Sequence, residues 1–119
     1  MTRLTIRMDF DDARQVGHGK IRLLEMIERQ GSISGAARAM EMSYRRAWLL
    51  LDEVNRMFSA PVVETRLGGK GGGTARLTPL GRKLVELYRE IETLAGDAFA
   101  ARARELETHL AAAGPADHT

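Results

Sequence analysis

The sequence predicts a mainly α-helical fold with a small β component, and two observations carry the prediction. Apolar residues recur at steps of three and four in several segments, as they do in amphipathic helices. These segments are 20–31, 34–40, 44–58 and 79–112. Two further segments rich in β-branched residues, 62–67 and 74–77, flank a run of glycines as the strands of a hairpin do. The order of these segments predicts a winged helix-turn-helix with a long C-terminal dimerisation helix.

Length and composition exclude several classes of protein. A chain of 119 residues has the size of one domain, and without cysteine it has neither a disulfide nor a thiolate metal site. Its three histidines are not spaced like metal ligands, and no Ser, His and Asp set suggests catalysis, so we expect no enzyme, metal or cofactor. The first residues lack the apolar core of a signal peptide, and no run is long enough to span a membrane. We therefore expect a cytoplasmic, nucleoid-associated protein.

Charge is distributed unevenly along the chain, although the formal net charge is only +2. Residues 1–43 carry 7 basic and 6 acidic groups, residues 44–83 carry 8 and 3, and residues 84–119 carry 3 and 7. The net charges of the three segments are therefore +1, +5 and −4. A basic middle segment fits a surface that faces phosphates, and the acidic remainder is expected to face away from DNA.

The N-terminal part is expected to form one strand and one helix. Apolar and polar residues alternate over 4–10, which is the period of a half-buried strand. Residues 11–19 are rich in turn formers and are expected to be a connection. The helix over 20–31 should end at Gly31 and cover the core on the side opposite the helix-turn-helix.

Residues 34–58 are predicted to be the helix-turn-helix. Ser34 can cap the first helix, and the small Ala36 and Ala37 allow a second helix to cross closely. Met40 is expected to complete the buried face. A short turn follows, and a second helix begins after it.

The second helix, 44–58, is predicted to enter a major groove, with Ser43 as its cap. Its apolar residues recur at the helical period and are expected to be buried. They are Ala47, Trp48, Leu51, Val54 and Phe58. The residues left on its leading surface are expected to contact bases and phosphates, together with Ser34 and Ser43. They are Tyr44, Arg45, Arg46 and Leu49.

The segment 62–77 is predicted to be the wing. Its tip, 68–73, is almost entirely glycine, and strand-like segments flank it symmetrically, which favours a hairpin over the alternative of a disordered linker. The tip does not match a nucleotide-binding loop, because glycine follows Lys70 where that loop needs serine or threonine. Arg66, Lys70 and Arg76 are expected to contact the DNA backbone or the minor groove.

The helix over 79–112 is predicted to begin with Thr78 as N-cap and Pro79 in its first turn. Its apolar residues are spaced like a seam that packs against another helix. Those assigned to dimerisation are Leu84, Leu87, Ile91, Leu94, Ala98, Phe99 and Leu106. Because residues 1–78 leave little to cover so long a stripe, we expect a homodimer. The alternative is a helix whose second half frays in solvent.

Two further features of this region are expected. The apolar stripe takes a five-residue step from Leu94 to Phe99, beside Gly96, which predicts a shift of register or a kink. The last residues, 113–119, are small and polar and are expected to be disordered.

Several short motifs in this order point to a known family. They are Gly19-Lys20, Gly31-Ser32-Ile33-Ser34 with Ala36-Ala37, Met42-Ser43-Tyr44 with Ala47-Trp48, Glu53-Val54-Asn55, the glycines of 68–73, and Leu77-Thr78 with Gly81. Over 17–90 the sequence resembles the N-terminal DNA-binding domain of the ModE family of molybdate-responsive transcription regulators, which is related to the winged helix-turn-helix of LysR-type regulators.

The resemblance implies a dimeric, sequence-specific bacterial or archaeal DNA-binding protein, with 43–46 at the groove and Lys70 on the wing. Two departures limit what it implies. Glu41 occupies the turn where the family often has glycine, and a left-handed residue there adds strain of about 1 kcal/mol. Molybdate sensing in the family needs a C-terminal oxyanion-binding module, and the sequence ends before one, so that property is not expected here.

The expected function is a transcription regulator that binds double-stranded DNA as a homodimer, with its operator and any small-molecule effector unassigned. One alternative is an interaction subunit that heterodimerises with a full-length regulator and modulates it. Another is a nonspecific architectural DNA binder. Arg45 and Arg46 favour the regulator over the interaction subunit, since a subunit that only pairs has no need of them.

Overall fold

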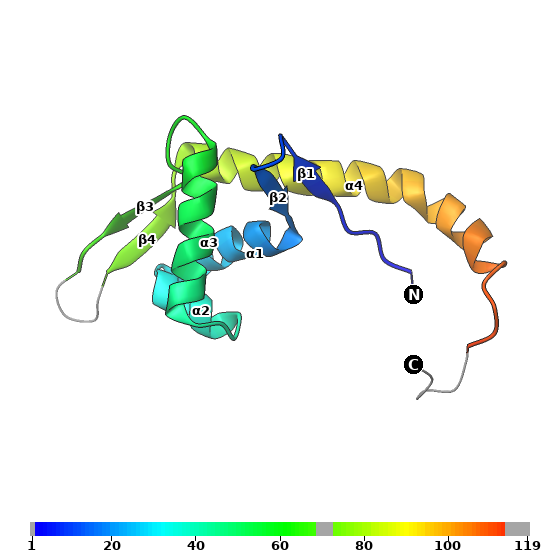
Figure 1. Ribbon diagram of the computed structural model, residues 1–119, viewed down its shortest axis with the longest axis horizontal. Coiled ribbons are helices and arrows are strands. Elements are labelled where there is room, and N and C mark those ends of the chain that lie inside the picture. The colour runs from blue at the N-terminus through cyan, green and yellow to red at the C-terminus, as the bar shows by residue number, and fades with distance from the viewer. Residues whose placement is uncertain (1, 69–72, 114–119) are drawn as a thin grey trace.

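The computed structural model describes residues 2–68 and 73–113. Its elements follow one another as β1 (Arg7–Asp9), β2 (Gln15–Gly17), α1 (His18–Gln30), α2 (Ile33–Ala39), α3 (Tyr44–Met57), β3 (Val63–Arg66), β4 (Thr74–Leu77) and α4 (Pro79–Glu107). Helices α1, α2 and α3 gather around one core, β3 and β4 project from one end, and α4 runs along the domain and beyond it (Figure 1). The predicted mainly α fold with a small β component is confirmed.

The N-terminal residues form an antiparallel hairpin, β1 and β2, whereas the sequence predicts a single strand over 4–10. The Asp11 carboxylate closes the turn by accepting hydrogen bonds from the backbone N–H groups of Ala13 and Arg14, at 3.0 and 2.8 Å. The connection predicted after the first strand therefore contains the second one. It lacks a sequence signal because Val16, which is fully buried, is its only apolar residue.

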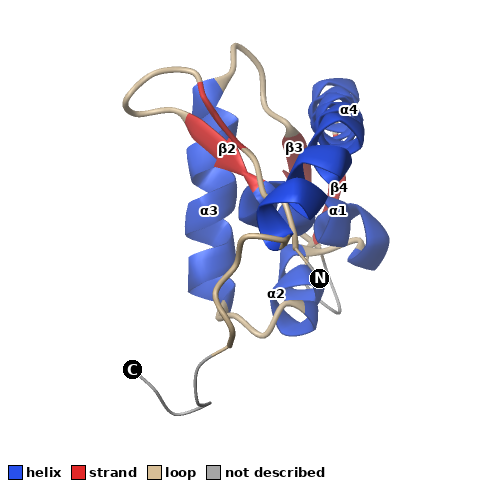
Figure 2. Ribbon diagram, turned by 90° about the vertical axis from the view of Figure 1, so that its right-hand side faces the viewer, coloured by secondary structure: helices blue, strands red, loops and turns tan. Residues whose placement is uncertain are grey.

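Helix α1 is the centre of the domain, and Figure 2 shows it between α3 and α4. It packs against α2, α3, β4 and α4, so the expectation that it lies opposite the helix-turn-helix is wrong. The reason is its wide apolar face, whose buried residues are Ile21, Leu23, Leu24, Met26 and Ile27. The helix ends as predicted at Gly31, whose φ of 76° is left-handed.

The N-cap of helix α2 lies two residues earlier than predicted. Ser32 has extended backbone angles and its Oγ accepts a hydrogen bond from the N–H of Gly35 at 2.9 Å, so Ser32, and not Ser34, is the N-cap. Ser34 is already helical and is exposed. After α2 the chain turns at Glu41, whose φ of 55° is left-handed. This is the conformation for which glycine is favoured, and it costs a glutamate about 1 kcal/mol.

Helix α3 is capped as predicted, because Ser43 Oγ accepts a hydrogen bond from the N–H of Arg46 at 3.1 Å. Its buried residues are Ala47, Leu51, Val54 and Met57. The prediction that Trp48 is buried is wrong, since its exposed fraction is 45%. One residue after Ala47, Trp48 is rotated by about 100° around the helix, away from the centre of the buried face. Phe58 follows the helix and is half-buried.

Strands β3 and β4 pair antiparallel and are fixed at their base to the helices. The side-chain oxygen of Asn55 on α3 accepts hydrogen bonds from the N–H groups of Val62 and Val63, at 2.8 and 3.2 Å. The N–H of Ala75 donates to the carbonyl of Gly31 at 2.9 Å. The hairpin is therefore held in a defined position beside the helix-turn-helix, as a wing is.

Helix α4 begins as predicted. Thr78 Oγ1 accepts a hydrogen bond from the N–H of Gly81 at 3.0 Å, and Pro79 lies in the first turn. The helix ends at Glu107, several residues before the predicted end at 112. Of the described residues, no helix combines the length and apolar character that crossing a membrane requires.

The apolar residues of α4 form two stripes, which explains the five-residue step in the sequence. At about 100° per residue, Leu87, Ile91, Leu94 and Ala98 share one stripe, and Tyr88, Phe99 and Leu106 share another. The step from Leu94 to Phe99 is therefore a change of stripe, and α4 continues through Gly96 without interruption. Leu84 is only 7% exposed and belongs to the domain core, so it is not available to a second chain.

Candidate nucleic-acid interface

The first two turns of α3 face solvent and carry both charged and apolar side chains. Arg45 and Leu49 are four residues apart, so they lie side by side on the outward face. Tyr44 and Trp48 lie toward the wing, where they line a pocket with it, whereas Arg46 lies on the other flank. Tyr44, Trp48 and Leu49 are 55%, 45% and 49% exposed. The surface is thus unusually apolar for the exposed side of a helix.

Several arginines of the helix-turn-helix and the wing have no acidic partner in the part of the chain that the structure describes. Four arginines on α2, α3 and β3 have no ion pair among the described residues, and they are Arg38, Arg45, Arg46 and Arg66. Further along α3 the charges are paired. Lys20 Nζ lies 2.6 Å from Glu53 Oε2, and Arg56 Nε lies 2.9 Å from Asp52 Oδ2. The uncompensated positive charge of α3 is therefore concentrated at its N-terminal end.

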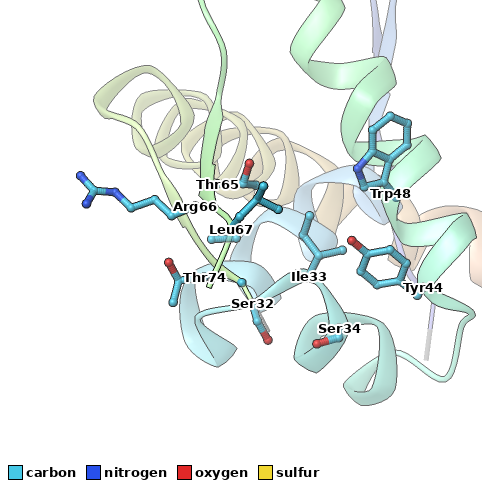
Figure 3. A pocket seen from close by; sticks show the side chains of 11 residues that line it. Ser32, Ile33, Ser34, Tyr44, Trp48, Thr65, Arg66, Leu67 and Thr74 are labelled. Atoms are coloured by element: carbon cyan, nitrogen blue, oxygen red, sulfur yellow. The ribbon is translucent and has the colours of Figure 1, made fainter. Parts of the chain in front are cut away.

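A pocket lies between the helix-turn-helix and the wing. Tyr44 and Trp48 from α3 line one side, Thr65 and Leu67 line the other, and Ile33 of α2 lies between them (Figure 3). The walls come from elements whose relative position is fixed by the hydrogen bonds at the base of the wing. A ligand that contacts α3 on this side is therefore within reach of the wing as well.

The two faces of the wing differ, because alternate residues of a strand point to opposite sides. Thr65 and Arg66 both line the pocket, but the side chain of Arg66 extends away from its interior (Figure 3). Arg76 Nε donates a hydrogen bond to Glu64 Oε1 at 3.2 Å, so its charge is partly neutralised. Lys70, the predicted wing contact, lies outside the described residues.

Two serines predicted to contact DNA lie at the starts of helices. Ser43 is exposed, and because its Oγ accepts the capping hydrogen bond, its O–H can still donate to a phosphate oxygen. It also lies at the N-terminus of α3, where backbone N–H groups and the helix dipole favour an anion. Ser34 is exposed on α2 and lines the pocket beside the wing.

Sequence reasoning missed two residues that the structure adds to this surface, namely Trp48 and Thr65. Trp48 has a signal in hindsight, since it follows Tyr44 by four positions and must share its face of the helix. Its size and its neighbour Ala47 instead suggest the core. Thr65 has no sequence signal, because its place opposite α3 depends on how the wing packs on the helices.

The chain was compared with known proteins, and no family model matches it. It is 42% identical over 93 residues to "Molybdenum transport protein ModE" of Azotobacter vinelandii, which covers 76% of this chain and 34% of that protein. It is 47% identical over 80 residues to "Molybdenum-pterin-binding protein MopA" of Rhodobacter capsulatus, covering 67% and 30% of the two chains. It is 40% identical over 80 residues to "DNA-binding transcriptional dual regulator ModE" of Escherichia coli K12, covering 67% and 30%.

Two further facts limit what can be concluded from these similarities. The chain spans about a third of the length of these relatives. Among solved structures it is similar to ArgP from Mycobacterium tuberculosis, with a TM-score of 0.52 and 16% identity, over 72% of this chain and 30% of ArgP. At 16% identity, the similarity to ArgP concerns the fold alone.

Proposed function

Because the chain is related to the ModE transcription regulators over about a third of their length, we propose that it binds double-stranded DNA sequence-specifically and regulates transcription as a homodimer. In this proposal α3 lies in the major groove and the glycine-rich wing contacts the backbone or the minor groove. The observation that carries the proposal is that Arg45 and Arg46, in the exposed first turn of a capped helix, have no acidic partner among the described residues.

The charges support DNA as the partner. An arginine beside a carboxylate gains little from a phosphate, since it already has an anionic neighbour. Arg45 and Arg46 have no such neighbour among the described residues, so each can release a counterion from DNA or bind a guanine edge with two hydrogen bonds. Arg45 is the better placed for bases because it lies on the outward face, whereas Arg46 lies on the flank, where the backbone passes.

The exposed stripe of α4 supports a homodimer. Leu87, Ile91 and Leu94 are 46%, 41% and 68% exposed, although they recur at the spacing of a helix seam. The second half of α4 also extends beyond the domain (Figure 1). A second copy packed on this stripe would cover the leucines and give a dimer with two copies of α3 related by a two-fold axis. Two half-sites then supply the specificity that one small domain lacks.

Other properties of the relatives are not transferred. Their names refer to molybdenum or to a molybdenum pterin, but this chain covers only about a third of them. No effector is therefore proposed. The interaction subunit is not favoured, since a subunit that only pairs has no need of exposed arginines on α3. The nonspecific architectural binder is not favoured, since relatives of the chain are named as transcription regulators. As a DNA-bound regulator the protein is expected in the cytoplasm, on the nucleoid.

The test is selection of bound fragments from a genomic DNA library by the purified protein at physiological salt. We expect an inverted repeat to be enriched and its affinity to fall steeply with salt. Arg45→Ala and Arg46→Ala should each cost about 1 to 3 kcal/mol, with relaxed base preference where the arginine contacts a base. Lys70→Ala should weaken binding to all sequences alike.

A matched control separates contact from overall charge. Arg102→Ala/Arg104→Ala removes the same two charges from exposed positions on the far part of α4. This control should retain the motif and most of the affinity, while Arg45→Ala/Arg46→Ala should lose both. Equal losses for the two double variants would contradict the assignment of α3 as the groove-facing helix, and enrichment without any motif would favour the architectural binder.

A further inference from the structure

We propose that the exposed face of α3 recognises thymine through its 5-methyl group, with Leu49, Tyr44 and Trp48 as the apolar surface that contacts it. This inference rests on the proposed binding of α3 in a major groove and adds the kind of base that is read there. It gives these three exposed side chains a role in base recognition, which neither helix capping nor the arginine contacts explain.

The first observation is that three large apolar side chains lie together in solvent. Tyr44, Trp48 and Leu49 are each about half exposed and line one shallow pocket with Arg45. Contiguous exposed apolar surface on a small protein indicates a binding site more often than chance. The described residues of the domain leave it exposed, and α3 buries its opposite face in the core.

The second observation is the charge around this surface, which selects DNA over protein as its occupant. Arg45 and Arg46 are unpaired among the described residues. The exposed leucines of α4, by contrast, lie among exposed carboxylates, namely Glu86, Glu90 and Asp97. An apolar surface between unpaired cations fits a polyanion that also offers apolar groups. The major groove of DNA is such a ligand.

The third step is chemical. The 5-methyl group of thymine is the one apolar group that the four bases present in the major groove, and aliphatic or aromatic side chains contact it. Arg45 and Leu49 are four residues apart, which is an advance of about 6 Å along the helix. A base-pair step is about 3.4 Å. The thymine read by Leu49 is therefore expected one or two base pairs from the base that Arg45 contacts.

The experiment uses the full chain and the duplex that it selects from a random-sequence pool. Each thymine of that duplex is replaced in turn by deoxyuridine, which removes the methyl group and keeps every hydrogen-bonding atom. We expect at least one position in each half-site at which wild-type affinity falls about fourfold, the ratio for one buried methyl-sized group. At that position Leu49→Ala or Trp48→Ala should bind the thymine and deoxyuridine duplexes equally.

Controls separate this inference from the proposed function. Leu4→Ala removes an exposed leucine from the N-terminal segment and should leave the methyl effect unchanged. A selected motif with no deoxyuridine-sensitive position, or a methyl effect that persists in the Leu49, Trp48 and Tyr44 variants, overturns the thymine assignment while DNA binding stands. Selection of no motif overturns both. Helical circular dichroism of each variant confirms that lost recognition is not lost folding.

Discussion

The two halves of α4 have the same apolar periodicity but different surroundings. The first half is fixed to its own domain. A Cβ atom at Gly81 would overlap the carbonyl oxygen of Val62, so the helix backbone packs directly on the base of the wing. Tyr88 is fully buried and its O–H donates to the carbonyl of Ile6 at 2.8 Å.

The second half of α4 has almost no such contacts. Leu94 and Leu106 are 68% and 69% exposed, and a Cβ atom at Gly96 would meet nothing within 4 Å. The difference shows what apolar periodicity can and cannot indicate. Apolar periodicity shows that one face of a helix is buried by something. Whether the helix's own domain buries that face is decided by tertiary contacts, such as the close backbone approach at Gly81 and the buried hydrogen bond of Tyr88. By that criterion only the first half of α4 is fixed to its own domain.

The largest expected effect is a loss of dimer stability when a charge is placed on the exposed second half of α4. Leu94→Asp should destabilise the dimer by about 4 kcal/mol, because two leucines lose their burial and two carboxylates would be desolvated at one interface. The folded monomer should be little affected, since Leu94 is 68% exposed. Sedimentation equilibrium over a range of concentrations measures the change in the dimer dissociation constant.

The matched control for this variant is Leu67→Asp, which makes the same chemical change at an exposed leucine of the wing. It should leave the dimer intact. If both variants sediment like the wild type, the stripe of Leu87, Ile91 and Leu94 is not the dimer contact. A wild type that is monomeric at every concentration would remove the homodimer from the proposed function.

The next largest effect is on the free energy of unfolding, and it comes from replacing Gly81 and Gly96, one in each half of α4. Gly81→Ala should destabilise the fold by about 3 kcal/mol, because the added methyl group forces the helix away from the backbone of Val62. Gly96→Ala places the same methyl group in open space and should stabilise the helix by about 0.5 to 1 kcal/mol. Urea unfolding of the two variants measures both signs, and equal stabilities would contradict the division of α4.

Much of the fold is encoded locally and was therefore predictable. The caps at Ser43 and Thr78, the helix end at Gly31 and the strand pair of the wing each follow from side-chain chemistry within a few residues. The N-cap of α2, which is Ser32 and not Ser34, is a local failure, but the larger failures involve contacts across the chain. β2 forms because the hairpin turn and the core select it, and α1 lies at the centre because α2, α3, β4 and α4 all pack against its wide apolar face. No local pattern reports such packing.

The candidate site was predictable to the same extent. Tyr44, Arg45, Arg46 and Leu49 could be assigned to the outer face from the helical period alone. Trp48 could not, because size and hydrophobicity predict burial when the neighbouring elements are unknown. Which arginines lack acidic partners is also a tertiary property. That property separates the α3 surface from the paired positions further along the same helix.

The smallest expected effect tests the ionic anchor of the first half of α4. Arg89 binds both carboxylate oxygens of Glu25 on α1, with Nε and Nη2 at 2.9 and 2.6 Å. This hydrogen-bonded guanidinium lowers the pKa of Glu25 below its ordinary value of 4.5. The two side chains are 33% and 37% exposed, so solvent screens the pair and Glu25→Gln should cost only about 1 kcal/mol at neutral pH.

The pH dependence distinguishes this anchor from a simple loss of packing. A carboxylate with a lower pKa in the folded than in the unfolded state stabilises the fold above its unfolded pKa, and the contribution is lost as the pH falls through the folded pKa. The stability difference between wild type and Glu25→Gln should therefore shrink as the pH falls from 7 to about 3. Glu90→Gln, at an exposed position beside Arg89, should show a small difference at every pH. If the stability difference between wild type and Glu25→Gln does not change with pH, the Glu25–Arg89 pair holds α4 through packing and not through charge.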